Sequence, residues 1–289
     1  MTAPLQALKA LTGAAVLAAL VAFGPAASGV VAEEAAGTAE AADLKQAAAR
    51  LSAADAVLLG EVHDNPQHHL NQAALLRALR PRAVVWEMLS PAQAAGLTPD
   101  LIQDAAALAR RLDWAASGWP DFALYAPVFA AAGDARHYGA LLPRTAARAA
   151  LERGAAGYFG PEDAAGLGLL AALPPAEQAA REAEQMAAHC GALPAEMLPG
   201  MVEIQRLRDA RLASEAARAL AETGGPVAVI TGNGHARSDR GIAVYLARLN
   251  PGATVLSLGQ SEAGRLDGRF DVVLDAPAAP RSDPCTAFR

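Results

Sequence analysis

The chain has 289 residues, a formal net charge of −6 and an aromatic content of only 4%. A chain of this length can bury a full core, which here must consist mainly of Ala, Leu and Val. No block of basic residues with interleaved aromatic residues occurs. This composition argues against nucleic acid as a partner, because phosphate contacts require concentrated Lys and Arg.

Residues 1–32 have the pattern of a secretory signal peptide. After Lys9, the stretch 10–23 is almost entirely apolar, and small residues at 24–28 interrupt it. This stretch is too short to span a bilayer comfortably, and an uncleaved N-terminal anchor is the alternative interpretation. We therefore expect an exported, soluble protein of the periplasm or cell envelope, without the N-terminal cysteine that lipid attachment requires.

The elements after this segment alternate between strands and helices. A continuous apolar run at 56–60 predicts a strand buried on both faces, and Pro66 opens a predicted helix that extends to about 79. Further strands are expected at 82–88, 137–142, 226–230, 253–258 and 270–274, with helices at 44–51, at 121–132 and up to about 249. The alternation predicts an α/β fold with a mostly parallel sheet flanked by helices.

The region 146–204 contains Gly, Pro and helical stretches but no strand signal. We predict that it forms a helical insert, a smaller cap domain, in an α/β core made of residues 40–145 and 205–289. The tail after 275 is rich in Pro and is expected to be irregular.

Unusual polar residues follow three of the predicted strands: Glu61, His63 and Asp64 after the first, Glu87 at the end of the second, and Asn233, His235 and Arg237 after 226–230. Each group by itself also fits an ordinary solvent-exposed turn. Because parallel strands end along one edge of a sheet, we predict that these side chains converge on one crevice. Carboxylates, imidazoles and a guanidinium are costly to bury together unless they bind something.

The two cysteines are Cys190 and Cys285. In an oxidising compartment two thiols without a metal-binding motif usually pair, so we expect a disulfide that ties the C-terminal tail to the body. Two unrelated buried thiols are the alternative.

Several of these blocks together resemble the ChaN family, the haem-binding uptake branch of the Tiki superfamily. The blocks are Leu59 to Asn65 with His68 and His69, Trp86 to Met88, Gln205 with Arg208 and Asp209, Gly232 to Arg237, and Asp283 to Cys285. The resemblance implies an α/β core with a helical insert, an envelope location and a role linked to haem or iron uptake. The chain departs from the family in lacking the lipidated cysteine that many members carry.

Haem binding requires an apolar slot, an iron ligand, and Arg or Lys for the propionates. Tyr158, on the apolar step 157–160, is the first candidate for the iron ligand, and Tyr125 is the second. We predict a haem-binding protein, with haem or another small molecule as ligand, and consider a homodimer and an envelope uptake receptor as partners.

The superfamily also includes hydrolases, which leaves an alternative for the same crevice. Zn or Mn held by His63, His235 and a carboxylate would activate water, and the other carboxylate of the pair Glu61 and Glu87 would act as general base. A third interpretation is a partner-binding scaffold in which the crevice is vestigial.

Overall fold

The computed structural model describes residues 41–283, 285 and 286, and the unit that begins at Ala42 is compact. The predicted signal segment, 1–32, lies outside the described residues. Within the described part of the chain, no helix combines the length and apolarity that a membrane span requires.

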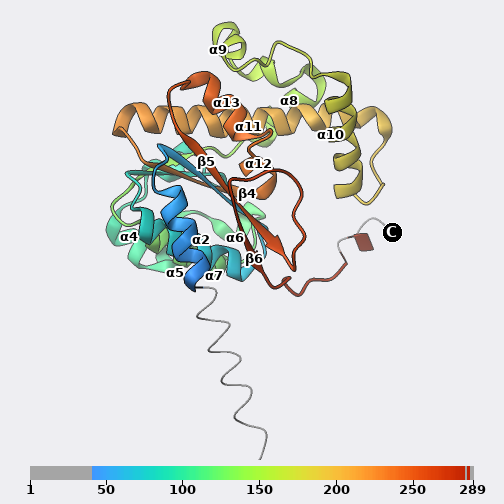
Figure 1. Ribbon diagram of the computed structural model, residues 1–289. Coiled ribbons are helices and arrows are strands. Elements are labelled where there is room, and N and C mark those ends of the chain that lie inside the picture. The colour runs from blue at the N-terminus through green and yellow to red at the C-terminus, as the bar shows by residue number, and fades with distance from the viewer. Residues whose placement is uncertain (1–40, 284, 287–289) are drawn as a thin grey trace, which may run out of the picture. The chain divides into compact units, whose positions relative to one another are not determined.

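One six-stranded sheet organises this unit, and every strand pair in it is parallel (Figure 1). The strand order is β3-β2-β4-β1-β5-β6. The strands are β1 (Ala56–Glu61), β2 (Ala83–Trp86), β3 (Arg136–Gly139), β4 (Val227–Gly232), β5 (Val255–Glu262) and β6 (Val272–Ala276). The predicted α/β class is confirmed. Since β1 and β4 are central and buried on both faces, their continuous apolar sequences are what such strands require.

Helices cover both faces of the sheet. Val57 and Leu59 of β1 face the core under α2 (Pro66–Leu79) and α7 (Phe122–Ala132), whereas Ala56 and Leu58 face the core under α11 and α13. The second layer comprises α8 (Arg144–Arg153), α11 (Leu198–Thr223) and α13 (Ile242–Leu249), and Figure 1 shows α11 running along this face. The shorter helices are α3 (Pro91–Ala95), α4 (Pro99–Gln103), α5 (Ala105–Arg111), α6 (Trp114–Ser117), η1 (Ala155–Tyr158), α9 (Pro161–Gly166), α10 (Pro175–Ala188), η2 (Ala195–Met197) and α12 (Asn233–Ala236).

The segment between β3 and β4 is helical throughout its regular elements, as the lack of a strand signal suggests. Its last helix, α11, has 26 residues and packs directly on the sheet through Leu207, Ala210 and Ala213. The middle of α11 is therefore part of the core layer, and its polar side chains can reach the edge of the sheet.

Strand β5 extends further than its sequence suggests. The apolar run predicts an end near 258, but β5 continues to Glu262 because Leu258 to Glu262 pair with β6. The polar residues of this extension, such as Gln260, form buried hydrogen bonds to the chain around β1, including the carbonyl of Gly60 at 2.8 Å.

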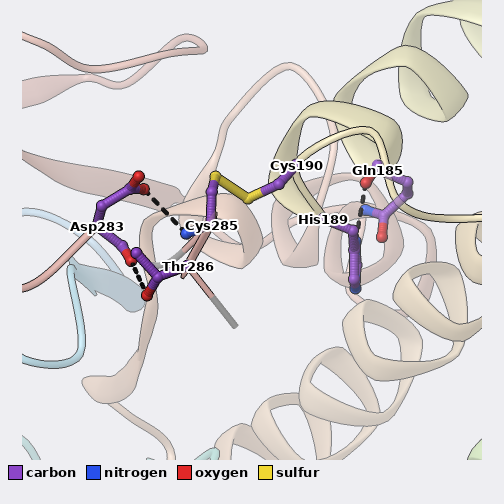
Figure 2. The surroundings of a disulfide bond; sticks show 6 residues. All are labelled: Gln185, His189, Cys190, Asp283, Cys285 and Thr286. Atoms are coloured by element: carbon purple, nitrogen blue, oxygen red, sulfur yellow. Dashed lines mark hydrogen bonds between the residues drawn. A yellow bond between two sulfur atoms is a disulfide. The ribbon is translucent and has the colours of Figure 1, made fainter. Parts of the chain in front are cut away.

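The predicted disulfide is present. Cys190 follows the end of α10, and Cys285 lies in the C-terminal tail, with a Cα–Cα distance of 5.5 Å across a sequence separation of 95 (Figure 2). The bond joins the segment after β3 to the end of the chain.

Candidate functional site: a crevice at the carboxyl edge of the sheet

Glu61, the last residue of β1, is the centre of a buried hydrogen-bond network. Its Oε1 accepts hydrogen bonds from the Tyr125 hydroxyl at 2.9 Å and from Nδ1 of His63 at 2.8 Å. Its Oε2 lies 3.3 Å from Nδ1 of His69, and the Glu61 side chain is 0% exposed. A buried carboxylate requires such partners, so Glu61 and its neighbours hold each other in place.

The ring of His63 is held on one side and open on the other. Nδ1 donates to Glu61, and the side chain is 39% exposed. Gly232 lies beside the opposite edge of the ring, where a Cβ would be 3.1 Å from Nε2. Glycine at 232 therefore leaves this edge uncrowded. Trp119 packs edge-on against the ring, with centroids 4.8 Å apart.

His63 is protonated at neutral pH. Burial by itself would lower its pKa, but the hydrogen bond from Nδ1 to Glu61 and the negative charges of Glu87, Glu61 and Asp64 outweigh burial and raise the pKa to about 9.

A second imidazole lies between two carboxylates. Nδ1 of His235, in α12, donates to Asp209 of α11 at 2.6 Å, and its Nε2 is 3.6 Å from Oε1 of Glu87. Glu87 in turn accepts hydrogen bonds from the Thr231 hydroxyl at 2.7 Å and from the backbone N–H of Gly232 at 2.9 Å. This row connects α11, α12 and the end of β2 across the sheet edge.

The charges of this row stabilise one another. Burial would raise the pKa of Glu87, but His235, His63 and the hydrogen bonds from Thr231 and Gly232 lower it to about 2. For His235, burial would lower the pKa, and the negative charges of Glu87 and Asp209 raise it above its ordinary value. Glu87 and His235 therefore favour each other's charged forms.

These groups line two adjoining cavities that share Val62 and His63, and together we call them the crevice. The arginine arm has a volume of about 890 Å³ and is lined by the two imidazoles and by Arg181, Arg237, Arg240 and Arg265. The apolar arm has a volume of about 600 Å³ and is lined by Trp119, Pro120, Leu141, Leu142 and Leu212, with Arg208 and Glu87 beside them. His63 is thus the group that both arms present to a ligand.

The structure brings all seven of the predicted strand-end residues to the crevice. Glu61, His63, Asn233, His235 and Arg237 line the arginine arm, and Asp64 and Glu87 line the apolar arm with His63. Three of them are strongly engaged elsewhere: Asn233 bonds the backbone of Gln260, Asp64 pairs with Arg281, and Arg237 pairs with Asp239.

The two tyrosines predicted as iron ligands lie elsewhere. Tyr125 is fully buried, its hydroxyl donates to Glu61, and burial and the charge of Glu61 raise its pKa. Tyr158, at the end of η1, is 40% exposed and lines a separate, smaller cavity of about 350 Å³ together with Arg153 and the alanines of α8. Neither residue lines the crevice.

Three residues that the sequence analysis named only within the family resemblance receive individual roles from the structure. His69 is fully buried, not solvent-facing, because its Nε2 donates to the carbonyl of His63 and its Nδ1 faces Glu61. Asp209 positions His235, and Arg208 lines the apolar arm. The adjacent Arg208 and Asp209 in an otherwise amphipathic helix were the available signal, but their partners lie on other elements.

Replacing Tyr125 by phenylalanine tests the buried network. The variant loses the hydroxyl that donates to Glu61, and a hydrogen bond to a charged group contributes about 1.5–3 kcal/mol, so we expect a loss of that size in the free energy of unfolding. Urea denaturation without reductant measures it. Equal stability of the variant and the wild type would mean that this hydrogen bond does not stabilise the network.

The Glu and His side chains of the crevice are not arranged as a metal centre. In residues 41–283, 285 and 286, no group of three or more His, Cys, Asp or Glu side chains converges on a point where a metal ion would be held. The Nδ1 atoms of His63 and His235 are instead bonded to carboxylates. The divalent-metal alternative therefore has no support in the geometry.

Comparisons with known proteins agree with the fold and with the family that the sequence resembles. A solved structure described as "Cofacial heme binding to ChaN of Campylobacter jejuni" superposes with a TM-score of 0.62 at 20% identity, over 79% of this chain and 90% of that chain. The type III effector HopBA1 superposes with a TM-score of 0.47 at 12% identity, over 82% of this chain and 94% of that one. No curated protein sequence matches. The family model described as "Haem-binding uptake, Tiki superfamily, ChaN" matches residues 47–246, well over half of the chain, so this protein belongs to the ChaN family of the Tiki superfamily.

Proposed function

We propose that this protein binds haem in the crevice and serves haem or iron uptake outside the cytoplasm. Membership of a haem-binding uptake family supports haem as the ligand. The observation that carries the site is the ring of His63, which the buried carboxylate of Glu61 holds at Nδ1 and Gly232 leaves uncrowded at Nε2.

The two arms of the crevice match the two parts of haem. The porphyrin needs an apolar slot, and Trp119, Leu141 and Leu142 offer one. The propionates need cations, and Arg208 and the arginine arm supply them. Cavities of about 300–1,000 Å³ are typical of small-molecule sites, and both arms are in this range.

His63 is the side chain best placed to hold the iron. Histidines that bind metals usually donate their other ring N–H to a carboxylate or carbonyl, which fixes the ring and makes the free nitrogen a better ligand. His63 has this arrangement through Glu61. Haem bound here would supply an iron centre, and the chain would supply the imidazole, the apolar wall and the cations.

Tyr158 is the rival iron ligand. Of the four tyrosines in the chain, Tyr125, Tyr138 and Tyr245 are buried, whereas Tyr158 is exposed beside Arg153. The cavity at Tyr158 is smaller than either arm of the crevice, so a porphyrin there would be covered less. The Campylobacter structure is described as cofacial heme binding. A homodimer of this chain would supply two sites, and we include it, and an envelope uptake receptor, in the proposal.

Export is part of the same proposal. The pattern of residues 1–32 is that of a cleaved signal peptide, and a disulfide between Cys190 and Cys285 suits an oxidising compartment. Intact-mass measurement of the protein from an envelope fraction should show a new N-terminus between about 28 and 36. Retention of Met1 in a soluble form would contradict cleavage.

Titration of the mature protein with hemin tests the function. We expect a Soret band distinct from that of free hemin, which saturates at one haem per chain, because an axial imidazole and an apolar wall both change the absorption of haem. Metal analysis of the same preparation is the companion measurement. Tightly bound Zn or Mn, without any shift of the Soret band, would favour the hydrolase alternative instead.

A further inference from the structure

Helix α10 forms one wall of the arginine arm but has little packing of its own. Arg181, Glu184 and Gln185 of this helix line the cavity. Of its 14 residues, Arg181 is the buried one, and the helix packs mainly against α11 (Figure 1). An isolated helix of this length is marginal in water, and segments with few buried apolar side chains open easily. Packing of half-buried side chains on α11 is therefore only part of what holds α10 in place.

Two kinds of contact hold α10 at the crevice. Glu184 forms ion pairs with Arg240 and, at 3.6 Å, with Arg237 across the arginine arm, but its side chain is 51% exposed. Exposed ion pairs contribute little to stability. The other contact is covalent, because Cys190 lies two residues after the end of α10 and is bonded to Cys285 (Figure 2).

The partner cysteine belongs to a tail that is anchored to the core. We call residues 277–283 with Cys285 the tail strap. Arg281 forms a paired hydrogen bond with Asp64, at 2.9 and 2.7 Å, and binds Glu262 of β5 at 2.6 and 2.7 Å. Asn65, which follows β1, donates to the carbonyl of Pro277 at 2.9 Å. The strap is thus fixed to the loop that carries His63, and the disulfide joins α10 to that fixed point.

We propose that the Cys190–Cys285 disulfide is a redox latch that holds α10 over the crevice, and that its reduction by a dithiol frees α10 and opens the arginine arm. A thiolate of the dithiol attacks one sulfur of the bond, and the other cysteine leaves as a thiolate that takes up a proton. The second thiol of the dithiol then resolves the mixed disulfide. Two electrons and two protons pass to Cys190 and Cys285, and the dithiol becomes a disulfide.

The environment of the bond permits this exchange. Both cysteines are partly exposed, so an attacking thiolate can reach the sulfur atoms. Cys190 has φ 58, a left-handed conformation that residues other than glycine disfavour, and Gly191 follows it with φ 72. Backbone hydrogen bonds also hold this turn, such as that from the N–H of Gly191 to the carbonyl of Met186 at 2.9 Å, so breaking the disulfide would separate α10 from the tail and leave its C-terminal turn in place.

A consequence for haem rests on the proposed function. If haem occupies the crevice, the closed latch slows its release, and reduction speeds release by moving the wall that carries Arg181. The reducing state of the protein's surroundings would then decide whether bound ligand is retained or passed on.

Hydrogen–deuterium exchange tests the latch without any ligand. The folded protein is compared before and after treatment with dithiothreitol, and we expect amide exchange in 175–188 to become at least tenfold faster while α2 and β1 stay protected. The double variant C190S/C285S should behave as the reduced protein does. If that variant does not fold, reduction of the folded wild type still decides the question. Unchanged exchange in α10, or equal loss of protection throughout the chain, would overturn the latch.

The variant R281Q is the matched control for the anchor. It keeps the disulfide but releases the strap from Asp64 and Glu262. Amide exchange in α10 should therefore become faster in this variant too. Unchanged exchange would show that the strap does not act as the fixed point. For the haem consequence, release to apomyoglobin should be at least tenfold faster from C190S/C285S than from wild type. Absence of haem binding would count against the proposed function alone, whereas normal haem binding with unchanged α10 exchange would count against the latch alone.

Discussion

In His63→Ala, haem binding is expected to weaken by at least about a hundredfold and the Soret band to be lost. Replacing a residue that only supports a metal ligand costs about 10–100-fold in affinity, and this variant removes the proposed ligand itself. Both arms of the crevice share His63, together with Val62, and Glu61 already holds the His63 ring at Nδ1. Hemin titration followed by absorption measures both effects.

Tyr158→Phe is the contrast to this variant. Tyr158 lines a separate cavity, so its replacement should leave the affinity within a few fold and the spectrum unchanged. The reverse pattern, loss of the band in Tyr158→Phe and retention in His63→Ala, would move the iron site to the surface of the helical segment. Both variants should first be shown to unfold cooperatively at wild-type urea concentrations.

The same assignment predicts how affinity depends on pH. Because the pKa of His63 is raised to about 9, iron must displace a proton from the ring at neutral pH. Well below this pKa, affinity should rise about tenfold for each pH unit. The total rise is roughly fiftyfold from pH 7 to pH 9, because the ring is half-deprotonated at its pKa, and affinity should level off above. Titrations across this range should show no such rise in His63→Ala. An affinity that is flat or falls between pH 7 and pH 9 in the wild type would contradict ligation by His63.

Glu61→Ala is expected to cause the largest loss of stability. The variant leaves the hydroxyl of Tyr125 buried without its acceptor. It also removes the carboxylate that lies 3.3 Å from Nδ1 of His69 and bonds His63. Removing one partner of a buried ionic cluster costs about 3–5 kcal/mol, so we expect a decrease of that order in the free energy of unfolding. Urea denaturation under non-reducing conditions, with the disulfide intact, is the measurement.

Glu222→Ala is the matched control. Glu222 also accepts a hydrogen bond from a tyrosine hydroxyl, that of Tyr138 at 2.9 Å, but on the solvent-exposed surface. Glu222→Ala should lower the free energy of unfolding much less than Glu61→Ala does, because water replaces the missing acceptor. Equal losses in Glu61→Ala and Glu222→Ala would mean that burial of Glu61 is not what makes its network important. The stability of Glu61→Gln, which keeps the shape of the side chain but not its charge, should lie between those of the wild type and Glu61→Ala.

Much of the architecture was predictable from local sequence. Strands β1 and β4 are continuous apolar runs because both of their faces are buried. Pro66 marks the start of α2 because the N–H groups of a first helical turn have no acceptor within the helix, so a residue without an N–H fits there. The convergence of Glu61, Glu87 and His235 followed from one rule, that parallel strands end along the same edge of a sheet.

The partners of those residues were not predictable. Asp209 reaches His235 because α11 crosses the sheet with one particular rotation, which the packing of Leu207 and Ala210 on the strands decides. His69 turns inward because the carboxylate of Glu61 and the carbonyl of His63 are there to receive it. The residue pattern of a helix such as α2 or α11 does not indicate where a polar group on another element lies.

The sequence by itself thus determined the fold class, the edge of the sheet at which the polar residues gather, and the two cysteines that pair. Only the tertiary structure decided that Tyr125 is buried against Glu61, that Tyr158 lies outside the crevice, and that the tail is anchored through Arg281 beside the loop of His63. The physical reason is the range of the interactions. Backbone pairing and apolar patterning are local and leave a signal in consecutive residues, whereas a buried hydrogen bond or ion pair depends on two side chains that only the packed core brings within about 3 Å of each other.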